Sequence, residues 1–301
     1  MTPGAGAHRQ AGMTGHDALR VASVNLLDGG VDPDGTTARR EQAAAALRDW
    51  QPHLVLVQEL YAPGEELVRG HWRALANATG LEPCALGLPR GSRRLRTGIL
   101  AATAALEILD DGPPPGRDAP YWAEATVRIR DSGTILAIVS VHAPATTAAG
   151  QLAEAQRLAT RAAQRGGITI AGGDWNCYTP ADALTSDELA ALPPHLRPSR
   201  TRQADGTLTA NHDVHDTLTS VGLADPVPVL PPGRRDPPRP PGTGSHPRAR
   251  IDRFYIWPGA ELLPAVRCYH QKPNPGSDHQ MIMICLDLAA LAVTRHPGPQ
   301  S

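Results

Sequence analysis

The chain has 301 residues and a mass of 31.9 kDa, with 41% hydrophobic and 20% charged residues. This length is sufficient for one large domain with a sizeable core. The formal net charge of −1 excludes a chain that is basic throughout, while a local basic patch stays open. The four cysteines are widely spaced and form no Cys-x-x-Cys pair, which predicts neither a zinc site nor a disulfide scaffold. We therefore expect reduced thiols and a cytoplasmic protein.

Apolar strand patterns alternate with helix patterns along the chain. Strands are predicted at 20–27, 53–60, 97–109, 122–130, 134–142, 168–172, 251–257 and 281–286. Helices are predicted at 37–50, 65–79 and 150–164. The short turn at 131–133 indicates a hairpin, which argues against a purely parallel sheet. The pattern favours an α/β fold in which two mixed sheets pack together with helices outside them.

One domain is expected at 18–289, between disordered tails at 1–17 and 290–301 that lack periodicity. No apolar run reaches the length of about 18 residues that a membrane span needs, and no secretory signal is visible, so we expect no membrane insertion. The segment 225–248 is rich in proline and arginine. Its composition favours a disordered loop and also fits a loop that faces the substrate. Lys272 is the only lysine among 29 basic residues, so arginine clusters carry little weight as a sign of nucleic-acid binding.

Polar residues recur where the predicted strands begin or end. They are Asn25, Glu59, His142, Asp174, Asn176, Asp252, Asp278 and His279. Because strand ends on one side of a sheet converge on one crevice, we expect these side chains to lie close together. Carboxylate and carboxamide oxygens suit Mg²⁺ or Mn²⁺ rather than zinc. A histidine beside such an ion suits the cleavage of a phosphate ester.

Taken singly, these residues have plainer explanations. Asp174 could be a turn residue, Glu59 an exposed strand cap and His142 a half-buried histidine without a catalytic role. Asn25 is harder to dismiss, because asparagine is depleted in strands. Asp252 stands among apolar residues and needs a partner if it is buried, for which a histidine is the natural choice. The plain explanations would all have to hold at once, which favours the catalytic interpretation.

The order of these motifs resembles the endonuclease/exonuclease/phosphatase superfamily, which has the deoxyribonuclease I-like fold. The motifs are Asn25, Gln58-Glu59, His142, Gly173-Asp174-Trp175-Asn176, Ile251-Asp252 and Ser277-Asp278-His279. The resemblance extends from about residue 20 to about residue 288. It implies a four-layer α/β sandwich, with two mixed β-sheets packed face to face and outer helices. It also implies a divalent-metal-dependent phosphodiesterase or phosphatase.

The resemblance also implies which residues hold the metal ion. Glu59 is expected as the main ligand of Mg²⁺, with Mn²⁺ as a substitute, and Asn25 and Asp278 as supporting ligands. Gln58 is expected to be structural, because neighbouring residues of a strand face opposite sides.

The same resemblance, together with the chemistry of the side chains, assigns the catalytic roles. Asp174 would orient or deprotonate the attacking water, and Asn176 would donate hydrogen bonds to a phosphoryl oxygen. His279 would stabilise the charged transition state, with Asp252 fixing its tautomer and raising its pKa. His142 would contact a phosphate oxygen or protonate the leaving group, and the choice between the two histidines as general acid stays open.

The leading function is the hydrolysis of phosphodiester bonds by a monomeric, metal-dependent endonuclease or exonuclease acting on DNA or RNA. The alternative is a phosphatase or phosphodiesterase acting on a lipid head group, an inositol phosphate or another small phosphate ester. His142 favours those branches of the superfamily that carry a histidine at this point, and no motif selects among them. A third hypothesis is a catalytically silent binding module, which is disfavoured because every expected catalytic position holds a competent residue.

Overall fold

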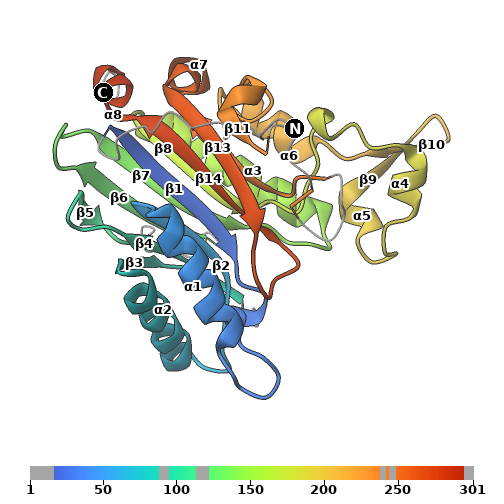
Figure 1. Ribbon diagram of the computed structural model, residues 1–301. Helices are drawn as coiled ribbons and strands as arrows, with labels where there is room; N and C mark the ends of the chain where they lie inside the picture. Colours follow the sequence, from blue (N-terminus) through green and yellow to red (C-terminus); the bar gives the residue numbers. More distant parts are fainter. Residues whose placement is uncertain (1–16, 88–94, 113–121, 238–241, 244–248, 295–301) are drawn as a thin grey trace, which may run out of the picture.

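The computed structural model describes residues 17–87, 95–112, 122–237, 242–243 and 249–294. Figure 1 shows that these residues form two large sheets, with helices on their outer faces and a small projecting lobe. Of the tails expected at 1–17 and 290–301, residues 1–16 and 295–301 lie outside the described residues. Among the described residues, no helix combines the length and the apolar character that crossing a bilayer requires.

Both large sheets are mixed. The seven-stranded sheet runs β11 (Arg235–Asp236), β13 (Val266–Pro273), β14 (Gln280–Asp287), β1 (Ala18–Asn25), β2 (Leu54–Tyr61), β4 (Leu95–Ala101) and β3 (Glu82–Leu86). The five-stranded sheet runs β12 (Asp252–Trp257), β8 (Ile168–Asp174), β7 (Ile135–His142), β6 (Ala123–Ile129) and β5 (Leu106–Asp110). A separate hairpin consists of β9 (Thr201–Ala204) and β10 (Thr207–Ala210).

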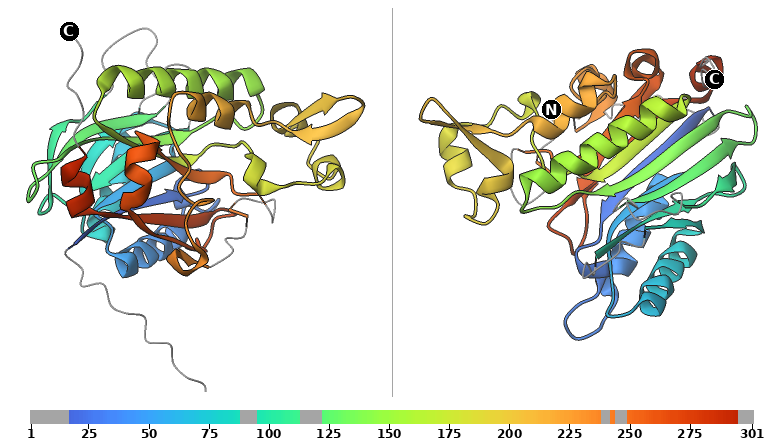
Figure 2. Two further views of the ribbon diagram at one scale, coloured as in Figure 1. Left: turned by 90° about the horizontal axis from the view of Figure 1, so that it is seen from above. Right: turned by 180° about the vertical axis from the view of Figure 1, so that it is seen from behind.

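The helices are distributed over the outer faces and the edges of the sheets. The α-helices are α1 (Ala38–Trp50), α2 (Glu65–Thr79), α3 (Ala148–Arg165), α4 (Ser186–Ala190), α5 (Arg197–Arg200), α6 (Asp213–Ser220), α7 (Gly259–Leu262) and α8 (Leu288–Val293). The 3-10 helices are η1 (Asp28–Gly30), η2 (Pro180–Asp182), η3 (Pro232–Arg234) and η4 (Leu263–Ala265). Figure 2 shows α3 and α6 on one side of the molecule and α1 and α2 on the other.

Three apolar clusters hold the layers together. The largest lies between the two sheets, the second under α1 and α2, and the third under α3 and α6. Strand β7 shows why the chain divides its side chains in this way. Leu136 and Ile138 belong to the cluster between the sheets, while Val139 and Val141 belong to the cluster under α3, since successive strand residues face opposite sides. The predicted four-layer α/β sandwich is therefore confirmed.

Several boundaries differ from the sequence-based expectations. The single strand expected at 97–109 is two strands, β4 and β5, which a turn at 102–105 sends into different sheets. Strands β3 and β13 were not predicted, because a proline in each, Pro83 and Pro273, weakens the strand pattern. Helix α8 covers part of the expected C-terminal tail, and Leu291 anchors it in the core.

The cysteines correct the expectation of four reduced thiols. Cys268 on β13 and Cys285 on β14 are register partners in adjacent antiparallel strands and are joined by a disulfide. Cys84 and Cys177 are buried free thiols. The spacing of Cys268 and Cys285 along the chain gave no sign of the bond, because the register of the two strands brings them together.

The proline-rich segment 225–248 is described only in part, and its described residues are ordered. Strand β11 joins the edge of the seven-stranded sheet, and Thr243 is fully buried. The hydroxyl oxygen of Thr243 accepts hydrogen bonds from the backbone N–H groups of Ile251 and Asp252, both at 2.8 Å. The described part therefore supports the start of β12 rather than forming a disordered loop, while residues 238–241 and 244–248 lie outside the described residues.

Gly173 in β8 occupies a position that no other residue can adopt without strain. Its φ is 145°, and a Cβ atom there would lie 2.0 Å from the backbone oxygen of Val141 in the neighbouring strand. We expect Gly173→Ala to lower the free energy of unfolding by at least about 3 kcal/mol, measured by urea denaturation. Gly70→Ala is the matched control, since a Cβ there meets nothing within 4 Å, and it should stabilise α2 by about 0.5–1 kcal/mol. Equal stability of the two variants would contradict this assignment.

Candidate active site

Sheet register brings the predicted site residues to one edge of the sandwich. His142 ends β7 and lies beside Asp174, which ends the parallel strand β8. Asp252 begins the antiparallel strand β12 and is also a register partner of Asp174. Asn25 ends β1, and His279 directly precedes β14, which runs antiparallel to β1. Residues far apart in the chain therefore meet where these strands begin or end.

Glu59 reaches the site through an irregularity in β2. The register of β2 against β4 shifts between Val57 and Leu60, and Glu59 itself has a φ of 57°. Such a bulge redirects a side chain that regular alternation would send to the other face. Glu59 Oε1 accepts a hydrogen bond from Asn25 Nδ2 at 3.1 Å, and Glu59 Oε2 accepts one from the backbone N–H of Asp28 at 3.1 Å. Both carboxylate oxygens are thereby fixed.

Gln58, the neighbour of Glu59, points between the sheets. Its side chain accepts a hydrogen bond from the Ser23 hydroxyl at 3.2 Å and donates one to the Ser140 hydroxyl at 3.1 Å. Gln58 is fully buried and connects one sheet to the other. The structure thus gives Gln58 a packing position and does not place it in the cavity described below.

Asp174 is buried at the centre of the cluster, with 1% of its surface exposed. Its Oδ2 accepts a hydrogen bond from Asn25 Nδ2 at 3.3 Å, and its Oδ1 accepts one from the backbone N–H of Asn176 at 2.9 Å. Asn176 has a φ of 49°, a conformation that asparagine tolerates better than most residues. Both oxygens of this carboxylate are therefore held in fixed directions.

His279 and Asp252 form a buried pair. His279 Nδ1 donates to Asp252 Oδ2 at 2.8 Å, so its Nε2 is turned toward Asp174 Oδ2 at 3.8 Å. Burial opposes protonation of His279, but the carboxylates of Asp252 and Asp174 outweigh it and raise the pKa of His279 to about 10. The ring is therefore an imidazolium at neutral pH.

His142 and Asp278 lie at the rim of the same cluster. His142 Nε2 is 3.7 Å from Glu59 Oε1 and 3.6 Å from Asp174 Oδ2, which is beyond hydrogen-bond distance. The half-exposed Asp278 has its Oδ1 3.8 Å from His279 Nε2.

A cavity of about 650 Å³ opens between these groups. Six of the predicted site residues line it, and they are Glu59, His142, Asp174, Asn176, Asp278 and His279.

The other two predicted residues, Asn25 and Asp252, lie behind the cavity wall. Asn25 contacts two acidic residues of the cluster. It turns its amide nitrogen toward Glu59 and Asp174, while its Oδ1 accepts the backbone N–H of Leu27 at 3.0 Å. In this arrangement Asn25 orients two carboxylates, and its part as a supporting metal ligand stays a prediction.

Sequence reasoning did not find Arg200, which lies at the end of α5 and also lines the cavity. Arg200 is only 3% exposed, and its guanidinium donates to Asn176 Oδ1 at 2.5 Å. The guanidinium carbon lies 5.8 Å from the centre of the Tyr178 ring. Within the described part of the chain, no carboxylate forms an ion pair with Arg200. No local motif marks this arginine, because the projecting lobe of α4, α5, β9 and β10 carries it to the site.

The metal-ligating atoms of the cluster are close enough to share one ion. One ligand atom from each of Glu59, His142 and Asp174 lies within 4.8 Å of the others, and a second such group consists of Asp174, Asp252 and His279.

A comparison with known protein families decides the classification. A model described as the "Endonuclease/Exonuclease/phosphatase family" matches residues 22–279. The chain belongs to this family. The resemblance stated from the motifs is therefore confirmed over most of the chain. Members of the endonuclease/exonuclease/phosphatase family are phosphoesterase hydrolases that generally use divalent metals.

Solved structures share the fold at low sequence identity. A family protein from Bacteroides thetaiotaomicron has a TM-score of 0.59 and 17% identity, covering 90% of this chain and 98% of that one. D. rerio TDP2, solved with a single-strand DNA product, has a TM-score of 0.59 and 15% identity, covering 90% and 99%. A mannosyl-6-phosphatase from Bacteroides thetaiotaomicron has a TM-score of 0.55 and 15% identity, covering 88% and 98%. No curated protein sequence matches the chain.

Proposed function

We propose that this family member is a divalent-metal-dependent phosphoesterase that hydrolyses phosphodiester bonds in DNA or RNA. One observation carries the proposal: Glu59, Asp174 and the imidazolium of His279 face a single cavity of about 650 Å³. This set offers hard oxygen ligands, a carboxylate beside them and a cation for phosphoryl oxygens. The DNA-bound TDP2 structure supports a nucleic-acid substrate by analogy of fold only.

The residues of the cavity fit a divalent ion such as Mg²⁺ or Mn²⁺. Glu59, Asp174 and Asp278 bring carboxylates to one space, and two of these, Glu59 and Asp174, share the amide N–H donors of Asn25. Such oxygen groups are the preferred ligands of these ions. Glu59 would be the main protein ligand, supported by Asp278. When bound, the ion would polarise a phosphoryl oxygen and offset charge on the leaving oxygen.

The chain's own groups would bind and orient the substrate and move protons. Asp174 would hold the attacking water through its fixed carboxylate and accept its proton. Nε2–H of His279 would donate to a phosphoryl oxygen, with Asp252 keeping the ring protonated and oriented. His142 would contact a phosphate oxygen or protonate the leaving group from the opposite rim.

Arg200 would add a second cation for the phosphate. A charge-assisted hydrogen bond from a guanidinium contributes about 1.5–3 kcal/mol, so Arg200→Gln should lower kcat/KM by about tenfold to a hundredfold. Arg202→Gln is the matched control, because Arg202 is 47% exposed in its side chain and is paired with Asp213. The affinity for inorganic phosphate should fall in Arg200→Gln alone. Wild-type kinetics in Arg200→Gln would remove this residue from the phosphate site.

The proposal is tested on supercoiled plasmid and on bis(p-nitrophenyl) phosphate, each with Mg²⁺, with Mn²⁺ and with EDTA. Metal-dependent nicking of the plasmid would support the nuclease assignment. Cleavage of the small diester without nicking would support the catalytic residues and would favour a lipid or another small phosphate ester as the substrate. Absence of hydrolysis under every condition would contradict the proposal.

A further inference from the structure

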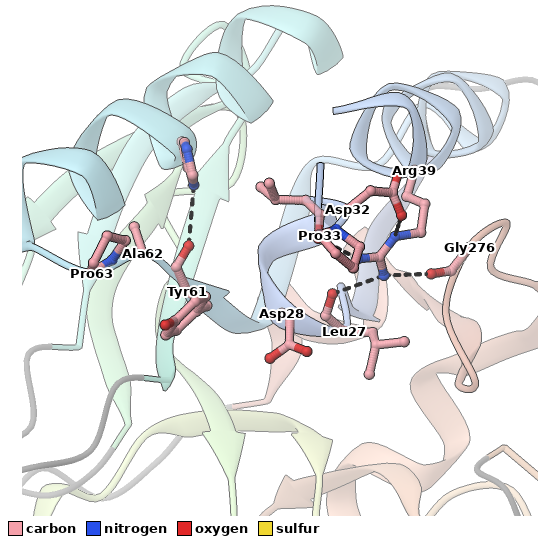
Figure 3. A pocket seen from close by; sticks show the side chains of 11 residues that line it. Leu27, Asp28, Asp32, Pro33, Arg39, Tyr61, Ala62, Pro63 and Gly276 are labelled. Carbon is pink, nitrogen blue, oxygen red and sulfur yellow. Dashed lines mark hydrogen bonds and ion pairs between the residues drawn. The ribbon is translucent and has the colours of Figure 1, made fainter. Parts of the chain in front are cut away.

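A second cavity, of about 740 Å³, lies next to the candidate active site. Figure 3 shows residues 61–63 on one side of it and residues from the segment 27–33 on the other. The two cavities share a wall, because the backbone N–H of Asp28 donates to Glu59 Oε2 at 3.1 Å. Gly276, which also lines the second cavity, is two residues before Asp278 of the first. The second cavity therefore begins one hydrogen bond away from Glu59, which lines the first.

The segment that follows β1 is held in an unusual backbone conformation. Leu27 and Asp28 have φ values of 50° and 54°, which side-chain-bearing residues seldom adopt. Gly29 follows with a φ of 74°, and a Cβ atom there would lie 2.9 Å from the backbone oxygen of Tyr61. The segment therefore packs directly against the end of β2. Backbone strain of this kind persists where a binding site needs a fixed shape.

Arg39 braces the other side of the cavity. Its Nε donates to Asp32 Oδ1 at 2.7 Å, and three of its other N–H groups donate to the backbone oxygens of Leu27, Val31 and Gly276. The guanidinium thus ties the loop after β1 to the loop before Asp278, as Figure 3 shows. Its charge is paired with Asp32, and four of its five N–H groups donate to protein oxygens.

The described residues that line the cavity therefore offer hydrogen-bond acceptors and apolar surface, and the arginine among them, Arg39, is paired with Asp32. Among the described residues, no cation pairs with Asp28. His71 Nδ1 lies 3.2 Å from the backbone oxygen of Tyr61 and must donate to it, which leaves Nε2 as an acceptor. Burial and the charge of Arg40 lower the pKa of His71, so its ring is neutral at pH 7. Leu27, Val31, Pro33, Ala62 and Pro63 supply the apolar surface.

We propose that this cavity is a substrate subsite for an uncharged ring that carries hydrogen-bond donors, a sugar or nucleobase attached to the scissile phosphate. The proposal rests on the proposed function, because it takes the neighbouring cavity as the phosphate site. The ring of Tyr61 provides an aromatic face for stacking, and the Asp28 carboxylate accepts hydrogen bonds from hydroxyl or amino groups. A second phosphate would be repelled by the Asp28 carboxylate. The volume lies within the range of about 300–1,000 Å³ that is usual for small-molecule sites.

The test compares the dissociation constants of inorganic phosphate, ribose 5-phosphate and adenosine 5′-monophosphate by calorimetry. The measurements are made in Mg²⁺ and, to exclude turnover, in EDTA. We expect a ring-bearing monophosphate to bind the wild-type protein at least about tenfold more tightly than inorganic phosphate. If ribose 5-phosphate already binds more tightly than inorganic phosphate, the sugar is the occupant. If only the nucleotide binds more tightly, the base is the occupant.

Val31→Trp fills the cavity and should remove this gain while leaving the affinity for inorganic phosphate unchanged. Val229→Trp is the matched control, since Val229 is 62% exposed and lines neither cavity. Asp28→Asn is a second variant that suits the backbone conformation and should reduce the gain by removing the charged acceptor. Absence of a gain in the wild-type protein, or its persistence in Val31→Trp, would overturn the subsite.

The failure of the subsite and that of the proposed function are distinguishable. If the protein shows metal-dependent hydrolysis but binds ring-bearing monophosphates no more tightly than inorganic phosphate, the subsite is wrong and the proposed function stands. The opposite result is also possible to recognise. If the wild-type protein binds ring-bearing monophosphates more tightly, Val31→Trp abolishes this difference, and no phosphate ester is hydrolysed, the proposed function is wrong and the subsite stands.

Discussion

The His279→Ala variant should hydrolyse a phosphodiester at least about 10²-fold more slowly than the wild-type protein, with most of the loss in kcat. The imidazolium of His279 faces Asp174 Oδ2 at 3.8 Å and is oriented by Asp252 at 2.8 Å. In the proposed mechanism it would supply positive charge where the transition state gains negative charge, so its loss should affect the chemical step. Initial rates on bis(p-nitrophenyl) phosphate over a range of substrate concentrations provide the measurement.

A double-mutant cycle shows whether His279 and Asp252 act as one unit. Because Asp252 is assigned only to hold His279, the double variant should be no slower than His279→Ala alone. His270→Ala is a matched control, since His270 lies on β13 beside the edge strand β11, with 31% of its side chain exposed. Retention of more than half of the wild-type activity by His279→Ala would remove this histidine from the mechanism.

Glu59→Gln is expected to remove most of the metal-dependent activity, again by at least about 10²-fold. The substitution keeps the size of the side chain and its acceptor oxygen but removes the charge that would hold the ion. The dissociation constant of Mn²⁺, measured by calorimetry, should rise at least about tenfold. Metal binding is measured without substrate, so the result does not depend on knowing the physiological substrate.

Glu65→Gln is the control for this measurement, because Glu65 is an exposed residue of α2 that pairs with Arg69 on the same helix. Its Mn²⁺ affinity and its activity should equal those of the wild-type protein. If Glu59→Gln bound Mn²⁺ as tightly as the control, the ion would have to be placed on other residues of the cavity, and the assignment of Glu59 would be wrong.

The sequence by itself determined the strand pattern, the fold class and the set of polar residues at the strand ends. These features are local: apolar alternation defines a strand, and a polar residue at its end is visible without knowing its neighbours. The order of Asn25, Glu59, His142, Asp174 and His279 along the chain then identified the family. Six of the eight predicted site residues line one cavity, and the other two orient them.

Only the tertiary structure decided which atoms face the cavity. Regular alternation would turn Glu59 away from Asn25, and the bulge in β2 turns it back. The amide of Asn25 presents its nitrogen because the backbone N–H of Leu27 engages its oxygen. Both outcomes depend on register and hydrogen-bond partners that local propensity does not contain.

Long-range contacts account for the remaining features that the sequence did not predict. Arg200 reaches the cavity because the lobe that carries α5 packs beside Tyr178, and Thr243 supports Asp252 from a segment whose composition suggested disorder. Cys268 and Cys285 are joined because β13 and β14 pair in one particular register. Such contacts form between segments distant in the chain, so they are set by how the layers pack and not by any local pattern of residues.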